Sequence, residues 1–263
     1  MHELLSLPYS PWSEKARFAL DVRRVPYTVR VYQPLLGEAA LRAKVRRWTG
    51  VVTVPVLTTD DGRVLSDSAD IARWADDQGE GPQLFPPGHD AAIARFIDLA
   101  ERGLAAGRAL SLTRVLADDE ALLELLPRRL RRVLGSGGRY VSGAAIRRTL
   151  RKYNAAGQDG QSHRRSMEEV LEAIRAALGG PPASGAPRSL LSTFTFADIA
   201  ASQVLAFVEP PAAGLKLLPA NRRCFGDAAL RAQFGDLVAW RDELYSAYRS
   251  ACAAAPRRRV DAS

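Results

Sequence analysis

The order of hydrophobic patterns along the chain constrains its fold more than any other feature of the sequence. Short apolar runs and helical patterns alternate through the first 80 or so residues. After about residue 90, every periodic segment has the apolar spacing of three and four that is typical of helices. Asp60-Asp61-Gly62 is a strong hairpin turn within the first region. The chain is therefore expected to combine an α/β half with an all-helical half.

Local patterns give bounds for the expected strands and helices. Strands are expected at residues 4–7, 27–32, 56–58 and 63–65. Helices in the same half are expected at residues 11–23, 38–48 and 67–77. Helices in the second half are expected at residues 91–116, 120–134, 144–154, 166–178, 197–208 and 228–253.

Glycine and proline mark the boundary between the two halves. Gly79-Glu80-Gly81-Pro82 and Pro86-Pro87-Gly88 break the helical pattern and indicate an interdomain linker. We expect an α/β domain at 1–80, a linker at 81–89, an all-helical domain at 90–255 and a disordered tail at 256–263. Gly135-Ser136-Gly137-Gly138 and residues 179–187 are expected to be flexible connections.

The composition is that of a globular protein in a reducing compartment. The 263 residues are 47% hydrophobic, and no apolar run approaches the ~18 residues of a membrane span. The start, Met1-His2-Glu3, lacks the basic region and long apolar run of a signal peptide. The two cysteines, Cys224 and Cys252, form no CxxC pair, so neither a disulfide framework nor a metal site is expected. These features favour the cytoplasm.

The net charge of +8 raises the question of an anionic partner. Its basic residues are scattered along the chain, with clusters at 128–132, 147–152 and 257–259. Such clusters are usually solvated helix faces, and we expect no nucleic-acid or membrane partner. Attraction of anionic substrates is the more modest functional interpretation.

The most informative local stretch begins at Ser10, where the first strand passes into a helix. Proline at the first helical position, Pro11, and a serine just before it are typical helix-start residues. A helix N-terminus has unpaired N–H groups and partial positive charge, which favour an anion such as a thiolate. The Ser10 hydroxyl can cap the helix, or it can donate a hydrogen bond to a bound sulfur.

Three motifs in order resemble the glutathione transferase superfamily. The run from Ser10 to Arg17 is similar to the Ser- or Cys-Pro-aromatic helix start of the omega, zeta and bacterial etherase-like classes. Residues 53–57, Thr-Val-Pro-Val-Leu, resemble the family's Val-Pro-x-Leu, and residues 67–71 resemble its Glu/Asp-Ser-x-x-Ile. The resemblance implies a thioredoxin-like N-terminal domain and an all-α C-terminal domain. In the helical half, Thr195-x-x-Asp198 fits the capping box that is a folding landmark of the family's second domain.

The resemblance assigns Ser10 to the catalytic position, where its hydroxyl would stabilise the thiolate of glutathione. Lowering a thiol pKa from ~8.5 by about two units needs ~2.7 kcal/mol, which a hydroxyl and helix N–H groups can supply. Tyr9 and Ser13 are the competing donors, and a plain N-cap is the structural alternative for Ser10. Trp12 occupies the family's aromatic position and either packs near the thiol or belongs to the core.

The resemblance also implies how the rest of glutathione is held. Val54 would bind the cysteinyl backbone through its own N–H and C=O, with a cis bond at Pro55 directing these groups to the ligand. Asp67 and Ser68 open a helix and would receive the γ-glutamyl end. The alternatives are a trans proline in a turn and an ordinary helix cap. For the glycyl carboxylate, Arg42 and Lys44 are candidates only.

The resulting hypothesis is a cytoplasmic, homodimeric, serine-type glutathione transferase that acts on a small hydrophobic electrophile. Thiol-assisted isomerisation, dehalogenation and ether cleavage stay open, as does a non-catalytic binding or regulatory protein on the same fold. Another low-molecular-weight thiol could replace glutathione. The loop at residues 48–52 lacks the family's common Asn-Pro, and residues 117–165 align with no class.

Overall fold

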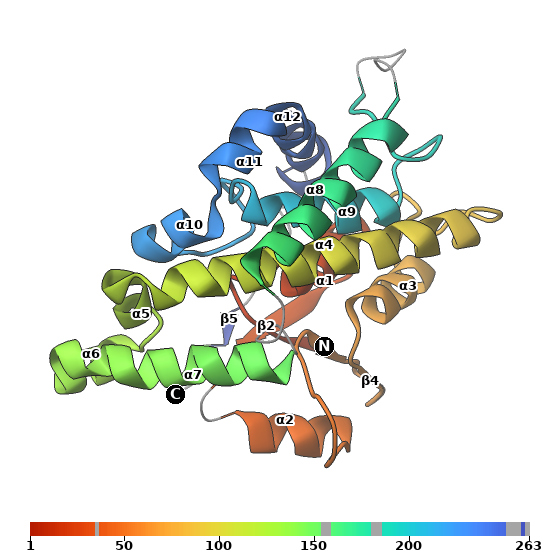
Figure 1. Cartoon of the computed structure of the whole chain (residues 1–263). Coiled ribbons are helices and arrows are strands. Elements are labelled where there is room, and N and C mark those ends of the chain that lie inside the picture. Colours follow the sequence, from red (N-terminus) through yellow and green to blue (C-terminus); the bar gives the residue numbers. More distant parts are fainter. Residues whose placement is uncertain (35–36, 154–158, 180–185, 251–258, 261–263) are drawn as a thin grey trace.

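The computed structural model describes residues 1–34, 37–153, 159–179, 186–250 and 259–260 (Figure 1). Its N-terminal part is built from β1 (His2–Ser6), α1 (Pro11–Val22), β2 (Tyr27–Val31), α2 (Glu38–Val45), β3 (Val56–Thr58), β4 (Val64–Leu65) and α3 (Ser68–Gln78). This is the βαβ–ββα order expected from the sequence. The thioredoxin-like prediction for the first half is therefore confirmed.

The strands form one mixed sheet in the order β4-β3-β1-β2-β5. β1 runs parallel to β2 and antiparallel to β3, and β4 pairs antiparallel with β3. The short strand β5 (Arg259–Val260) pairs in parallel with β2. The remainder of the predicted disordered tail, residues 256–258 and 261–263, lies outside the described residues.

Helix α1 is central because it contributes to two hydrophobic cores. Ala16 and Leu20 pack with the sheet and α3, whereas Phe18 and Val22 pack with the helical half. All four side chains are buried. A helix that is apolar on opposite faces must be covered on both sides.

Between residues 90 and 250, every regular element of the described residues is helical. The second half consists of α4 (Asp90–Leu116), α5 (Asp119–Glu124), α6 (Arg128–Leu134), η1 (Gly135–Gly137), α7 (Gly138–Lys152), α8 (Gly160–Ala177), α9 (Phe196–Val204), η3 (Leu205–Phe207), α10 (Pro219–Phe225), α11 (Ala228–Gln233), α12 (Gly235–Leu244) and η4 (Tyr245–Ser250). Helix α4 packs against α8 and α9. None of the described helices has the length and apolar character that crossing a bilayer requires.

Two glycines allow close packing of α4. A Cβ on Gly107 would lie within 2.4–2.7 Å of the Phe207 side chain, and a Cβ on Gly103 would lie 2.8 Å from Val170 and Val204. These separations are far below ordinary van der Waals contact. The long helix can therefore approach its neighbours only because both positions lack a side chain.

Several predicted helices have different bounds. The segment 120–134 was expected as one helix but forms α5 and α6, because Pro127 cannot donate a backbone hydrogen bond and disfavours helix at the residue before it. The segment 228–253 is divided after Gln233, where Phe234 leaves helical geometry before Gly235. Residues 135–138, expected to be flexible, form a 3₁₀ turn that runs directly into α7.

The capping box at the start of α9 is confirmed. The Asp198 carboxylate accepts hydrogen bonds from the backbone N–H groups of Thr195 (2.8 Å) and Leu190 (2.7 Å). The Thr195 hydroxyl in turn accepts from the N–H of Ala197 at 3.3 Å. These bonds fix the segment that packs against the linker, since Phe196 N–H donates to the carbonyl of Leu84.

A buried ion cluster joins the C-terminal helix to α1. Arg249 donates from Nε to Glu14 at 2.7 Å and pairs through Nη1 with Asp21. Arg17 donates from Nε to the second oxygen of Glu14 at 2.7 Å. Burial alone would raise the pKa of Glu14, but Arg17 and Arg249 outweigh it and hold that pKa below its usual range. The cluster therefore keeps Glu14 ionised between the two halves.

Candidate functional site

Ser10 is the N-cap of α1. Its Oγ accepts a long hydrogen bond of 3.4 Å from the N–H of Ser13, and its own N–H donates to the carbonyl of Leu7 at 3.2 Å. A hydroxyl can accept one hydrogen bond and donate another at the same time. Capping therefore leaves the Ser10 hydrogen free to be directed at a bound anion.

Val54 and Pro55 lie beside this helix start. β1 pairs with β3 through Leu5 and Val56, and continuing that antiparallel register places Pro55 opposite Ser6, at the end of β1 that leads to Ser10. The Val54–Pro55 peptide bond is cis, as predicted. The side chain of Val54 packs against the small cluster of Leu5, Leu41, Val52 and Val56.

Asp67 and Ser68 reach the same end of the sheet. β3 and β4 pair Leu57 with Leu65, and continuing that register brings Asp67 opposite Pro55. Asp67 is the N-cap of α3, is exposed, and accepts a hydrogen bond from the N–H of Ala69 at 2.7 Å. Ser68, the first helical residue, is buried. The N-termini of α1 and α3 and the segment before β3 therefore lie at the same end of the sheet.

The two competing donors are differently placed. Ser13 is fully buried, and its Oγ accepts a hydrogen bond from the N–H of Leu7 at 3.1 Å, so it serves the turn after β1. Burial, with a smaller contribution from Tyr32, raises the pKa of Tyr9 to about 12. The Tyr9 phenol therefore stays neutral at physiological pH. Of the three candidates, Ser10 has the geometry best suited to an external anion.

Trp12 forms part of a polar and aromatic arrangement between α1 and α4. Its indole N–H donates to Glu101 at 2.7 Å, and Lys15 pairs with the other oxygen of the same carboxylate. The guanidinium of Arg108 lies 4.7 Å from the Trp12 ring centroid and 3.6 Å from that of Tyr153. Trp12 is partly buried against the helical core, which agrees with the core interpretation; its packing near a thiol stays a prediction.

Arg108 and Tyr153 were not identified from the sequence. No carboxylate lies within ion-pair distance of Arg108 among the residues that the structure describes. Burial lowers the pKa of this guanidinium, while Tyr153 and Glu101 act in the opposite direction. One signal was available: Arg108 lies four residues after Leu104 and three before Ser111, on the buried stripe of α4. A positively charged side chain on the buried face of a helix indicates an unusual local environment.

The two candidates for the glycyl carboxylate both have other partners. Arg42 is held by Glu38 at 2.8 Å and by the carbonyl of Gly50 at 3.1 Å, so it closes the end of α2. Lys44 donates to Glu3 and Thr58 at 2.8 Å, at the opposite end of the sheet from Ser10. Lys44 is therefore remote from the candidate site.

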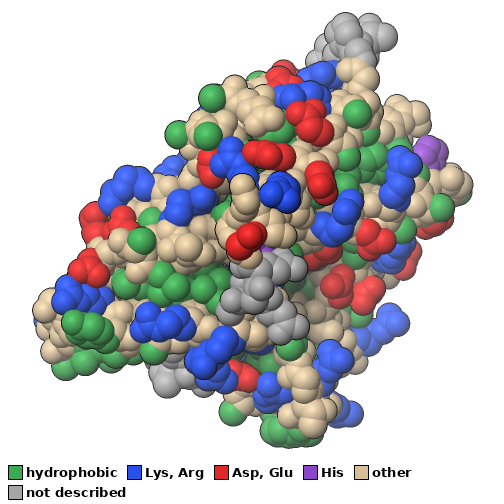
Figure 2. Space-filling view, in the orientation of Figure 1, with side chains coloured by type: hydrophobic (Ala, Val, Ile, Leu, Met, Phe, Trp, Pro, Cys, Tyr) green, Lys and Arg blue, Asp and Glu red, His purple; other side chains and the backbone are tan. Residues whose placement is uncertain are grey.

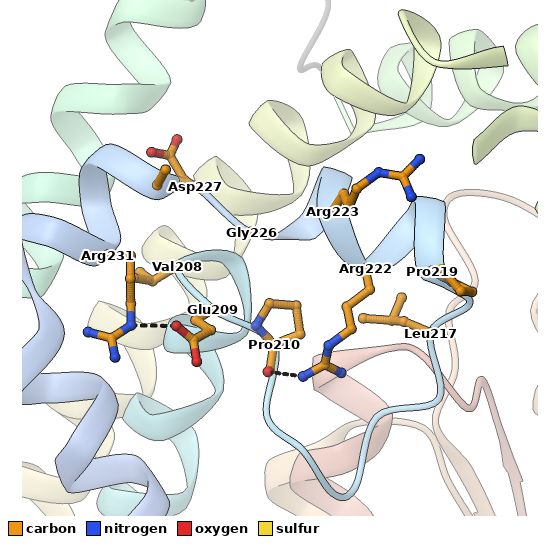
Figure 3. A pocket seen from close by; sticks show the side chains of 11 residues that line it. Val208, Glu209, Pro210, Leu217, Pro219, Arg222, Arg223, Gly226, Asp227 and Arg231 are labelled. Atoms are coloured by element: carbon orange, nitrogen blue, oxygen red, sulfur yellow. Dashed lines mark hydrogen bonds and ion pairs between the residues drawn. The ribbon is translucent and has the colours of Figure 1, made fainter. Parts of the chain in front are cut away.

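A pocket of about 650 Å³ lies elsewhere, in the helical half (Figure 3). Its charged side chains already have partners: Arg222 donates to the carbonyls of Pro210 and Pro211, and Arg231 pairs with Glu209. None of the residues predicted for the thiol site lines it. Among the described residues there is also no group of His, Cys, Asp and Glu side chains that could hold a metal ion.

Comparisons with known proteins agree with the fold. Residues 9–78 match the family description "Glutathione S-transferase, N-terminal domain". No curated protein sequence matches the chain significantly. Among solved structures, the fold is similar to a glutathione S-transferase of Ceriporiopsis subvermispora in complex with glutathione, with a TM-score of 0.64 and 20% identity over 98% of this chain and 99% of that one.

Two bacterial structures are similar over comparable lengths. A glutathione S-transferase of Methylobacterium radiotolerans, in complex with glutathione sulfonate, has a TM-score of 0.56 and 21% identity over 100% of this chain and 98% of that one. One of Methylobacillus flagellatus, with glutathione bound, has a TM-score of 0.58 and 17% identity over 96% and 99%. The fold is that of a glutathione transferase. Residues 9–78 are therefore similar to the N-terminal domain of glutathione S-transferases, and the chain as a whole has the fold of these proteins.

Proposed function

We propose that the protein is a glutathione transferase of the serine type, in which Ser10 stabilises the glutathione thiolate. The observation that carries this proposal is the position of Ser10. It caps α1 at the edge of the sheet that also holds the cis Val54–Pro55 bond and the N-terminus of α3. Solved structures with the same fold contain glutathione or its sulfonate, which supports glutathione as the ligand.

The proposed chemistry needs one hydrogen bond from Ser10 and the electrostatics of the helix start. The Ser10 O–H would donate to the sulfur while its Oγ goes on accepting from Ser13 N–H. A hydrogen bond to a charged group contributes about 1.5–3 kcal/mol, which equals a fall of about one to two units in the thiol pKa. The N-terminus of α1 adds to this stabilisation.

The rest of the tripeptide would be held by backbone and carboxylate groups at the same edge. Val54 would pair through its N–H and C=O with the cysteinyl backbone, as an added strand does. Asp67 has one carboxylate oxygen on Ala69 N–H, and its second oxygen could bind the γ-glutamyl ammonium. The N–H and hydroxyl of Ser68 would receive the γ-glutamyl carboxylate.

The electrophile would lie between α1 and α4, near Trp12, Arg108 and Tyr153. The thiolate sulfur would form a bond to an electrophilic carbon, and a leaving group would depart with its electron pair. Aromatic faces suit a hydrophobic second substrate. Isomerisation, dehalogenation and ether cleavage are alternative reactions that would use the same thiolate. The protein would act as a homodimer in the cytoplasm.

Calorimetric titration with glutathione tests the proposal. Asp67→Ala should weaken binding about 5–150-fold, because a charge-assisted bond worth about 1–3 kcal/mol is lost. Asp159→Ala is the matched control: Asp159 caps α8 through a 2.6 Å bond from Ser162 N–H and is remote in sequence from the site. It should cost similar stability and leave affinity unchanged. Absence of binding at millimolar glutathione would refute the assignment.

A further inference from the structure

One acid-free segment carries all of the excess positive charge of the chain. Between Leu125 and Tyr153 there are nine basic residues and no Asp or Glu. The whole chain has 37 Lys and Arg against 29 Asp and Glu, so the remainder holds 28 basic and 29 acidic residues. The net charge is therefore a property of α6 and α7 and not of the surface as a whole.

Helix α6 has no buried residue. Its apolar side chains lie on one face, at the helical spacing of three and four, and are exposed: Leu130 by 41%, Val133 by 81% and Leu134 by 39%. Beyond the 3₁₀ turn, Tyr140 is 66% exposed and Val141 43%. At lower left, where Figure 1 places α6, Figure 2 shows exposed hydrophobic side chains beside Lys and Arg side chains.

The arginines of α6 differ from several basic residues of α7, of which Arg139 pairs with Asp119 at 2.6 Å. Arg148 pairs with Glu38 at 3.1 Å and Lys152 donates to the carbonyl of Val52 at 2.8 Å, so this end of α7 is fastened to the N-terminal half. No ion pair among the described residues involves an arginine of α6, namely Arg128, Arg129, Arg131 and Arg132. Figure 1 shows α6 at the end of α7 that points away from α2.

We propose that α6 and the first turns of α7 form a docking surface for an anionic lipid bilayer. A short helix with arginines beside an exposed apolar face fits the interface of such a bilayer, where the apolar side chains enter the headgroup region and the arginines meet phosphates. This proposal departs from the expectation, drawn from the sequence, that the basic clusters are only solvated faces. It does not depend on the proposed transferase activity.

Charge and composition favour lipid over the two other occupants. A second copy placed face to face would bring the unpaired arginines of both α6 helices together, and these repel each other; the nearby carboxylate of Asp119 is already paired with Arg139. Nucleic acid would satisfy the arginines but would leave Val133 and its apolar neighbours in water. Of these three occupants, only an anionic bilayer offers a counter-charge and an apolar layer at the same depth.

Vesicle co-sedimentation tests the proposal. The full chain should bind vesicles of equal parts phosphatidylglycerol and phosphatidylcholine at low salt, and should not bind pure phosphatidylcholine. Arg131→Ser/Arg132→Ser should lower the partition coefficient about 30-fold, since each arginine near the surface contributes about fivefold. Leu130→Ser/Val133→Ser should also weaken binding, and because these side chains are exposed the thermal midpoint should hardly change.

The control is Arg46→Ser/Arg47→Ser, which removes the same charge from the exposed turn that follows α2. It should retain binding within about twofold. An equal loss of vesicle binding in this control would mean that binding depends only on the overall charge of the protein, and it would overturn the proposal. So would unchanged binding by the α6 variants, binding to phosphatidylcholine alone, or a lower oligomer mass for Leu130→Ser/Val133→Ser, which would identify a second copy as the occupant.

Discussion

Replacing Ser10 with alanine separates a helix cap from a thiolate donor, because the two roles predict effects of very different size. The only hydrogen bond that Ser10 Oγ makes within the described residues is to Ser13 N–H, at 3.4 Å. This is longer than the 2.7–3.2 Å of a normal N–H···O bond. The loss of stability should therefore lie near the low end for an N-cap, about 0.5 kcal/mol.

The effect on a bound thiol should be larger. Loss of a hydrogen bond to an anion, about 1.5–3 kcal/mol, raises the pKa of bound glutathione by about one to two units. Conjugation at neutral pH should then slow about 10–100-fold. Glutathione affinity should change little, because Val54, Asp67 and Ser68 would still hold the tripeptide.

The assay is a pH titration of thiolate absorbance in the far ultraviolet, with the protein saturated by glutathione. Ser13→Ala is the matched control: it removes a buried hydroxyl that accepts from Leu7 N–H at 3.1 Å. It should cost about 1–3 kcal/mol of stability by leaving that N–H unsatisfied, and leave the thiol pKa in place. Superimposable titration curves for wild type and Ser10→Ala would refute the thiolate role, and a shift in Ser13→Ala alone would transfer it.

Four further predictions concern packing, assembly and specificity. Arg249→Met should cost about 3–5 kcal/mol in denaturant unfolding at pH 7 by leaving Glu14 under-compensated. Because Glu14 has a lowered pKa when folded, its stabilisation is present above pH 4.5 and is lost as pH falls further, so the two proteins should converge in acid. Gly107→Ala should cost about 1–3 kcal/mol by collision with Phe207, measured by thermal melting against the exposed Gly160→Ala. Light scattering at micromolar concentration should give the mass of a dimer, and the mass of a monomer would refute the proposed homodimer. The Arg108 guanidinium lies between Trp12 and Tyr153 and would attract an anionic group on the second substrate. Arg108→Met should therefore weaken binding of S-(4-carboxybenzyl)glutathione more than that of S-benzylglutathione, and an equal change would exclude this charge-selective role.

The first half of the fold could be predicted because its signals are local. Ser10 and Pro11 mark the start of α1, and the Asp-Asp-Gly turn separates β3 from β4. Each of these depends on neighbouring residues alone. The same holds for the capping box of α9, which is complete within four residues. Some predicted helix ends are wrong by a few residues. Helix α2, for example, was expected to reach residue 48 but ends at Val45, because Arg46 adopts left-handed geometry.

The second half shows where local signals fail. The apolar spacing of 120–134 continues through Pro127, so the pattern predicts one helix while the backbone requires two. Helix α10 is only seven residues long and too short to show a period. The environment of Arg108 depends on Trp12 and Tyr153, which tertiary packing brings together from distant parts of the chain. Ser10, Asp67 and the cis Pro55 could be predicted from the sequence only because each belongs to a short motif.

Helix α1 has a consequence for how the protein unfolds. Its opposite faces belong to different cores, with Leu20 in one and Phe18 in the other. A fragment ending at residue 80 would expose Phe18, Ala19 and Val22 to water. It would also lack Arg249, the residue that pairs with Glu14. Gly79 and Gly81, which follow α3, lie so close to the end of α1 that a Cβ at either position would collide with the backbone of Arg23 or Val22. The two halves are therefore expected to melt in a single cooperative transition, so the border between them in the sequence is not a border in folding.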